Sequence, residues 1–123
     1  MLQLLLDEHI PPAVAEAVPR IHPEASIVAL RDWRSGAFLG RTDHEILLEA
    51  HKLGFTLVTY DVRTIPSLLR HWAESDMSHG GVIYIDHRTI LPSDIGGLAR
   101  ALAAVIHRYS ERDWTKQVLF LER

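Results

Sequence analysis

Five short apolar runs, separated by segments with helical periodicity, set the strongest constraint on how this chain folds. The runs cover residues 2–6, 25–30, 55–59, 82–85 and 118–121. None of them alternates cleanly between apolar and polar residues, which is typical of strands that are covered on both faces. Strands that alternate with helices predict an α/β fold with a single doubly wound, mostly parallel five-stranded sheet and helices on both faces.

The helical segments carry recognisable signals at their ends. Thr42, followed by Glu45 three residues later, forms a capping box, and Gly54 supplies a left-handed stop, so a helix is predicted between them. Another helix is predicted over residues 13–18, and Ser93 is expected to cap the last and longest helix. The remaining helix is indicated by apolar residues at helical spacing, namely Ile65, Leu68, Leu69 and Trp72.

Length and composition restrict the class of protein further. The 123 residues have the length of one domain, and they include 47% hydrophobic residues, 24% charged residues and no cysteine. A disulfide scaffold, a thiolate metal site and a cysteine nucleophile are therefore excluded. The first apolar run stops at Asp7 and is too short for a signal peptide, so we expect one domain over residues 1–123 in a cytoplasmic protein without membrane contact. The net charge of −3 disfavours nonspecific coating of nucleic acid.

Three aspartates are expected to meet at one edge of the predicted sheet. Asp7 and Asp61 each follow an apolar run, and Asp43 lies in the first turn of a helix that starts at the same edge. Ligands of open parallel sheets bind at this edge, where the strand order reverses. Because close carboxylates repel one another, a hard cation such as Mg²⁺ or Mn²⁺ is their simplest counterion. The sequence thus predicts a metal site at Asp7, Asp43 and Asp61, with Glu8 as a further candidate.

Structural explanations exist for several of these residues. An acid in the first turn of a helix is stabilised by the helix dipole whatever its function, which applies to Asp43. Asp86 follows the fourth apolar run and precedes His87 and Arg88, and we interpret it as a turn former. Trp33 and Phe38, in the long loop after the second run, are candidates for either partner contacts or core packing.

Three segments of the chain together resemble a known family. They are Leu4-Leu5-Leu6-Asp7-Glu8-His9-Ile10-Pro11, Thr42-Asp43 with the following Glu45-Ile46-Leu47 and Ala50, and Leu57-Val58-Thr59-Tyr60-Asp61. In their order and spacing they look like the small PIN-like domains, relatives of the PIN nucleases that act as toxins in bacterial toxin–antitoxin pairs and in RNA processing. The resemblance covers about the first two thirds of the chain.

The resemblance implies a function as well as a fold. It implies a Mg²⁺ or Mn²⁺ site and phosphodiester hydrolysis, most often of RNA, with Asp7, Asp43 and Asp61 as the metal-holding acids and Thr59 as the hydroxyl residue of the third motif. A small antitoxin protein or a homodimer is the implied partner. One departure is Arg63, which stands where such domains often carry another aspartate, and its charge disfavours a second metal ion. Arg63 is itself a candidate to bind the scissile phosphate.

The sequence leaves three hypotheses for function. The first is metal-assisted hydrolysis of RNA, with Glu8 or His9 orienting or deprotonating the attacking water and with Arg34, Arg63, Thr59 and His9 as nucleic-acid contacts. The second is a catalytically degenerate PIN-like module held by a partner protein. The third is a phosphoacceptor receiver-like domain, which also has acids after its first and third strands but requires a lysine after the fifth, where this chain has Leu121-Glu122-Arg123.

Overall fold

All five predicted strands form, and they lie in one sheet. The computed structural model describes residues 1–123, with β1 (Gln3–Leu6), β2 (Ser26–Ala29), β3 (Phe55–Thr59), β4 (Val82–Tyr84) and β5 (Val118–Phe120). The helices are α1 (Ala13–Ile21), α2 (Asp43–Leu53), α3 (Thr64–Glu74) and α4 (Ile95–Tyr109), and a short 3-10 segment covers Trp33–Gly36. Every strand pair is parallel, which confirms the α/β prediction.

The strand order places the first strand of the chain in the interior of the sheet, between β2 and β3. The order is β2-β1-β3-β4-β5, so the chain builds outward on one side of β1 and then on the other, and the direction reverses between β1 and β3. Leu6 is in register with Val58, and the backbone N–H of Asp7 donates to the Val58 carbonyl at 3.0 Å. The residues that follow β1 and β3 therefore leave the sheet side by side.

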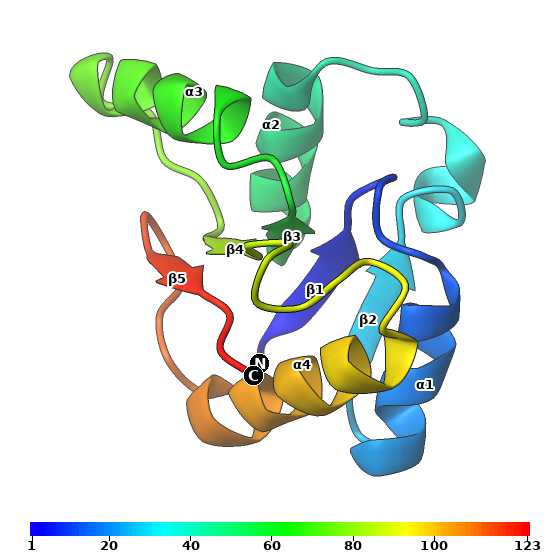
Figure 1. The fold of residues 1–123 in the computed structure, drawn as a ribbon. Helices are drawn as coiled ribbons and strands as arrows, with labels where there is room; N and C mark the ends of the chain where they lie inside the picture. The colour runs from blue at the N-terminus through cyan, green and yellow to red at the C-terminus, as the bar shows by residue number, and fades with distance from the viewer.

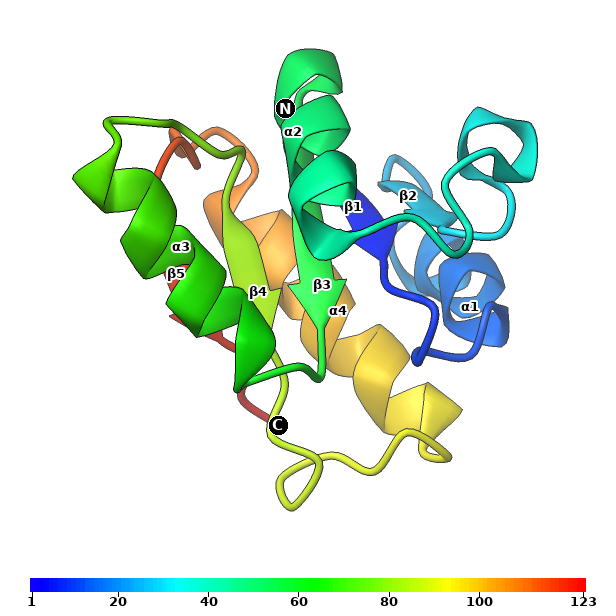
Figure 2. The same ribbon diagram turned by 90° about the horizontal axis from the view of Figure 1, so that it is seen from above.

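Helices cover both faces of the sheet. Helices α1 and α4 lie on one face, and α2 and α3 lie on the other (Figure 1). Seen from above, α2 and α3 stand in front of the strands and α4 lies behind them (Figure 2). Successive strand residues alternate between the two cores, because Leu4 and Leu6 pack with α1 and α4 while Leu5 packs with α2. All these strand residues are fully buried, as expected for strands that are covered by helices on both faces.

Two predicted helix boundaries need correction. Asp94, and not Ser93, caps α4, because Asp94 directly precedes the helix and its Oδ1 accepts a hydrogen bond from the Gly97 N–H at 2.9 Å. Helix α1 continues three residues past the predicted end at residue 18, through Pro19 to Ile21. The prediction for α2 is confirmed, since the Thr42 hydroxyl accepts from the Glu45 N–H at 3.2 Å. No helix combines the length and the apolar character that crossing a bilayer requires.

The long loop after β2 is held by aromatic packing. Trp33 is only 4% exposed and its ring centroid lies 5.1 Å from that of Phe38 and 5.8 Å from that of Phe55. Of the two interpretations of Trp33 and Phe38, core packing is therefore the one that the structure shows. The loop packs on the same core cluster as α2, which follows it in the chain.

Gly81, which precedes β4, allows a close backbone approach that any side chain would prevent. Its φ is +100°, and a Cβ there would lie 2.8 Å from the Trp114 carbonyl oxygen. Gly40 provides a matched control, because its φ is +77° but a Cβ would meet nothing within 4 Å. We expect Gly40→Ala to lose about 1–2 kcal/mol of unfolding free energy through backbone strain alone. We expect Gly81→Ala to lose at least about 3 kcal/mol, because overpacking adds to that strain.

Urea unfolding of both variants, followed by circular dichroism, measures the two losses. Equal losses for Gly40→Ala and Gly81→Ala would contradict the close contact between Gly81 and Trp114.

Candidate functional site

A buried threonine joins two of the predicted acids. Thr59 is the last residue of β3 and is fully buried, and its hydroxyl donates to Asp7 Oδ2 at 2.8 Å. The same hydroxyl oxygen accepts the backbone N–H of Asp61 at 3.0 Å. Asp7 is 8% exposed, and its Oδ1 accepts the Glu8 N–H at 2.8 Å. Thr59 thus fixes the carboxylate of Asp7 and the backbone of Asp61 relative to each other across β1 and β3.

Asp61 is held by the start of the next helix. Its Oδ1 accepts the N–H of Arg63 at 3.1 Å and the N–H of Thr64 at 2.8 Å. Two such bonds orient the carboxylate at the positive end of α3. No protein group donates to Asp61 Oδ2, which leaves this oxygen free for a ligand.

The pKa of Asp43 is affected by the charges of the neighbouring acids. Partial burial raises the pKa of its carboxyl above the usual range, and the charges of Asp7, Asp61 and Glu8 raise it further, in that order, while His9 opposes them. Asp43 is the first residue of α2, and neither of its carboxylate oxygens accepts a hydrogen bond from the protein. Four acids therefore share one electrostatic environment that the protein itself leaves without full compensation.

The acids suit a hard divalent cation by chemistry but are not arranged as a finished coordination shell. Nowhere in the structure do three or more histidine, cysteine, aspartate or glutamate side chains stand in a metal-holding group. The donor set around Asp7 and Asp61 consists of carboxylate and hydroxyl oxygens, which Mg²⁺ and Mn²⁺ prefer. The structure therefore brings Asp7, Thr59 and Asp61 together by direct hydrogen bonds, whereas it relates Asp43 to them through charge alone.

The other predicted residues occupy different positions. Glu8 and His9 are exposed in the turn after β1, and Arg63 is exposed at the start of α3. Arg34 pairs with Glu49 of α2 at 3.4 Å and has a positive φ of 52°. Its guanidinium is therefore engaged with the side of α2, while Arg63 forms no ion pair and is available to a ligand.

Asp86 has the structural role that its position suggests. Hydrogen bonds from the side chain and the backbone of Arg88 lower the pKa of Asp86 to about 2. The loop that contains Asp86 is tied to the end of β3 by Tyr60, whose hydroxyl donates to the Ile90 carbonyl at 2.8 Å. Burial raises the pKa of Tyr60 to about 12, so this tether persists at neutral pH.

Two features of the site were missed by sequence reasoning. The Trp72 indole N–H donates to His44 Nδ1 at 3.0 Å, so a neutral His44 next to Asp43 carries its hydrogen on Nε2. No local pattern predicts this contact, because it depends on how α2 and α3 pack. The second feature is an open hollow of about 750 Å³ along α3, lined by Arg63, Thr64, Ser67, Leu68 and His71. The spacing of four residues between Arg63, Ser67 and His71 is a signal that predicts such a polar helix face.

Comparison with known proteins adds no assignment to this geometry. No family model, no curated protein and no solved structure matches the chain. The function is therefore inferred from the residues described above.

Proposed function

We propose that this protein is a divalent-metal-dependent phosphodiesterase that hydrolyses RNA, as the resemblance to PIN-like domains implies. The observation that carries the proposal is the hydrogen-bonded set Asp7–Thr59–Asp61 at the point where the strand order reverses. The raised pKa of Asp43 supports it, because a group of acids that repel one another is stabilised by a cation. We assign Mg²⁺ or Mn²⁺ as the cation, because Asp7, Asp43 and Asp61 provide only oxygen donors.

Each residue of the site has a role that follows from its position. Asp7, Asp43 and Asp61 would hold the ion, which when bound neutralises charge on a phosphate and favours the ionisation of water. Thr59 orients Asp7 and Asp61 and is itself fully buried, so it acts as a positioning residue and not as an RNA contact. Glu8 and His9 are exposed beside Asp7 and are the candidates to orient or accept the proton of the attacking water.

The hollow along α3 is the proposed place for the RNA backbone. Arg63 stands at its end nearest to Asp61, and Ser67 and His71 follow at intervals of four residues, about 6 Å apart along the helix axis. An arginine suits phosphate because its guanidinium donates two parallel hydrogen bonds. The positive charge of Arg63 also keeps a second cation away from Asp61.

A binding module without catalysis is the second candidate function. Two observations favour it: no side-chain group stands in a finished metal-holding arrangement, and Arg63 provides a cation next to Asp61. In this case a protein partner, such as a small antitoxin, would hold the domain. Metal binding separates the two candidates, since the module requires none.

A phosphoacceptor domain has less support. Its strand order is the same as the one here, so topology does not separate it from a nuclease. The three residues that follow β5, Leu121-Glu122-Arg123, do not include the lysine that such a domain requires. Incubation with acetyl phosphate followed by intact-mass measurement tests this function, and a phosphorylated Asp61 would favour it over hydrolysis.

Removal of the Asp61 charge tests the hydrolytic proposal. We expect Asp61→Asn to cleave single-stranded RNA in Mn²⁺ at least about 100-fold more slowly than the parent, because one metal ligand is lost. Asp86→Asn is the matched control, since Asp86 lies beyond a neighbouring strand but is engaged by Arg88. Equal cleavage by the parent and Asp61→Asn would remove Asp61 from the mechanism, and absence of both cleavage and Mn²⁺ binding in the parent would favour the binding module.

The raised pKa of Asp43 predicts how stability depends on pH. The protonated carboxyl is favoured in the folded state, so its contribution to stability is complete below the unfolded pKa of about 3.9 and is lost as the pH rises through the higher folded pKa. We therefore expect Asp43→Asn to unfold a few degrees above the parent at pH 7 without metal, and at the same temperature at pH 3. Thermal melts at the two pH values measure this, and a lower melting temperature for Asp43→Asn at pH 7 would contradict the repulsion.

Arg63 is expected to act on the substrate and not on the metal. Arg63→Ala should weaken RNA binding about 10–100-fold, because a charge-assisted contact to phosphate is lost. The affinity of the Arg63→Ala variant for Mn²⁺, measured by calorimetry, should be equal to that of the parent or higher. Fluorescence anisotropy with labelled RNA measures the first effect, with Arg88→Ala as the control for a general change of charge. Unchanged RNA binding would exclude Arg63 from the interface.

A further inference from the structure

Strand β5 is an edge strand whose one protection is its length of three residues. It contains no charged residue and no proline, and Val118 is 51% exposed and Phe120 57% exposed. Natural sheets blunt such edges with short strands, charges, proline, bulges or a covering loop, because a bare edge pairs with other chains, and β5 has only the first of these. The edge of β5 is therefore available for pairing.

The backbone of β5 offers hydrogen-bonding groups on its free side. The Gln117 carbonyl accepts from the Val82 N–H at 3.0 Å, and the Leu121 N–H donates to the Tyr84 carbonyl at 2.8 Å. Because bonding groups alternate along a strand, the odd-numbered residues face β4 and the N–H and C=O groups of Val118 and Phe120 face outward. These four groups form the start of a ladder for one more strand.

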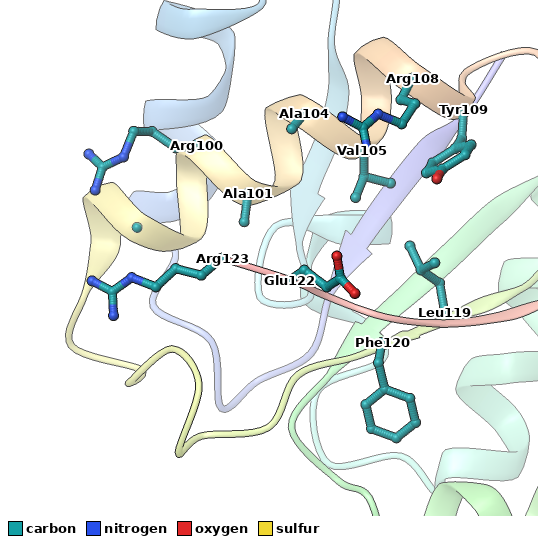
Figure 3. A pocket seen from close by; sticks show the side chains of 11 residues that line it. Arg100, Ala101, Ala104, Val105, Arg108, Tyr109, Leu119, Phe120, Glu122 and Arg123 are labelled. Carbon is teal, nitrogen blue, oxygen red and sulfur yellow. The ribbon is translucent and has the colours of Figure 1, made fainter.

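The two sides of β5 differ in chemistry. On the α4 side, Leu119 borders a cavity of about 470 Å³ that is also lined by Arg100, Arg108, Glu122 and Arg123. Figure 3 shows Leu119 directed toward α4 and Phe120 directed to the opposite side. There the Phe120 ring lies 5.3 Å from that of Tyr84, and Val118 borders a second cavity of about 370 Å³. One side of β5 thus borders three arginines, and the other presents the exposed apolar side chains of Val118 and Phe120 beside a cavity that Arg70 and Lys116 also line.

The charges around β5 are not compensated within the chain. The two cavities are lined by Arg70, Arg100, Arg108, Lys116 and Arg123 but by one acid, Glu122, in a chain of net charge −3. The Arg100 and Arg108 side chains form no ion pair, and the pairs Arg123–Asp94 and Lys116–Asp76 are 3.5 Å long and exposed. Exposed pairs of this kind contribute little, so the five cations remain able to bind an anionic partner.

We infer that the free edge of β5 binds an extended acidic segment of a partner protein, which adds to the sheet as a sixth strand. Side chains of an added strand alternate between the two sides, so the segment alternates acids with apolar residues. Its acids lie beside Arg100, Arg108 and Arg123, and its apolar residues lie beside Val118 and Phe120. The edge is separated from Asp61 by β4, so this interaction does not depend on metal or hydrolysis.

A second copy of the chain fits this edge less well. Antiparallel pairing of two β5 strands about a two-fold axis places the same side of both copies together. The cluster of Arg100, Arg108 and Arg123 would then face its own counterpart, and like charges across a strand pair are destabilising. The charge pattern therefore favours an acidic partner over self-association.

The test uses the full chain and a capped peptide that alternates glutamate with valine. Titration of ¹⁵N-labelled protein should shift the amide signals of Val118 and Phe120 and slow their exchange with solvent. A peptide with lysine in place of glutamate, and the glutamate peptide N-methylated on its bonding edge, should each bind at least about tenfold more weakly. Absence of shifts with the acidic peptide up to ~1 mM, or equal binding of the lysine peptide, would overturn the inference.

Protein variants test the backbone and the charges separately. Val118→Pro removes an outward N–H while leaving the β4 ladder intact, and it should weaken binding about tenfold, whereas Val118→Thr retains the N–H and should bind within about twofold of the parent. Reversal of two charges in Arg100→Glu/Arg108→Glu should also weaken binding about tenfold and reduce its dependence on salt. This double variant and the methylated peptide decide the matter if Val118→Pro does not fold.

Two further outcomes would assign the edge to another occupant. A dimer by sedimentation, with the Val118 and Phe120 amides already protected in the free protein, would assign it to a second copy. A single-stranded RNA that shifts these amides when the acidic peptide does not would assign it to nucleic acid. Either result overturns the inference of an acidic strand.

Discussion

The hydroxyl of Thr59 is the interaction on which the proposed site depends. It is buried at the end of β3, where it donates to the Asp7 carboxylate and accepts the Asp61 N–H. A carboxylate as buried as Asp7 is costly unless it receives hydrogen bonds, and Thr59 provides one of the two that it accepts. The same bond therefore lowers the cost of burying Asp7 and fixes its orientation relative to Asp61. Stability and geometry of the site are linked through one side chain.

The sequence predicted the sheet and part of the site. Continuous apolar runs identified the strands, and the rule that parallel strands end at a common edge placed Asp7 near Asp61. The position of Asp43 relative to these two residues was not predictable. It depends on the packing of the loop that contains Trp33, which precedes the first turn of α2. Nor could local sequence decide between Ser93 and Asp94 as the cap of α4, since both residue types favour this position.

The net charge of the chain conceals an uneven distribution. Acids gather where β1 and β3 end, whereas five cations surround β5, which is separated from β1 by β3 and β4 in the same sheet. A small negative total disfavours general binding of nucleic acid but says nothing about local patches. The arginines that sequence reasoning considered lie in the loop after β2 and at the start of α3, and the cluster on α4 and at the carboxyl terminus became visible only when the fold brought the two together.

The hydrogen bond between Asp7 and Thr59 joins residues that are 52 positions apart, which bears on the order of events during synthesis. The ribosome makes β1 first, but β1 has both of its neighbours in the sheet only when β3 emerges. A nascent chain that ends before residue 59 carries Asp7 and Asp43 without the hydroxyl that orients Asp7 and without Asp61. The acidic centre therefore cannot assemble on chains that end before residue 59, and truncated translation products of that length lack it altogether.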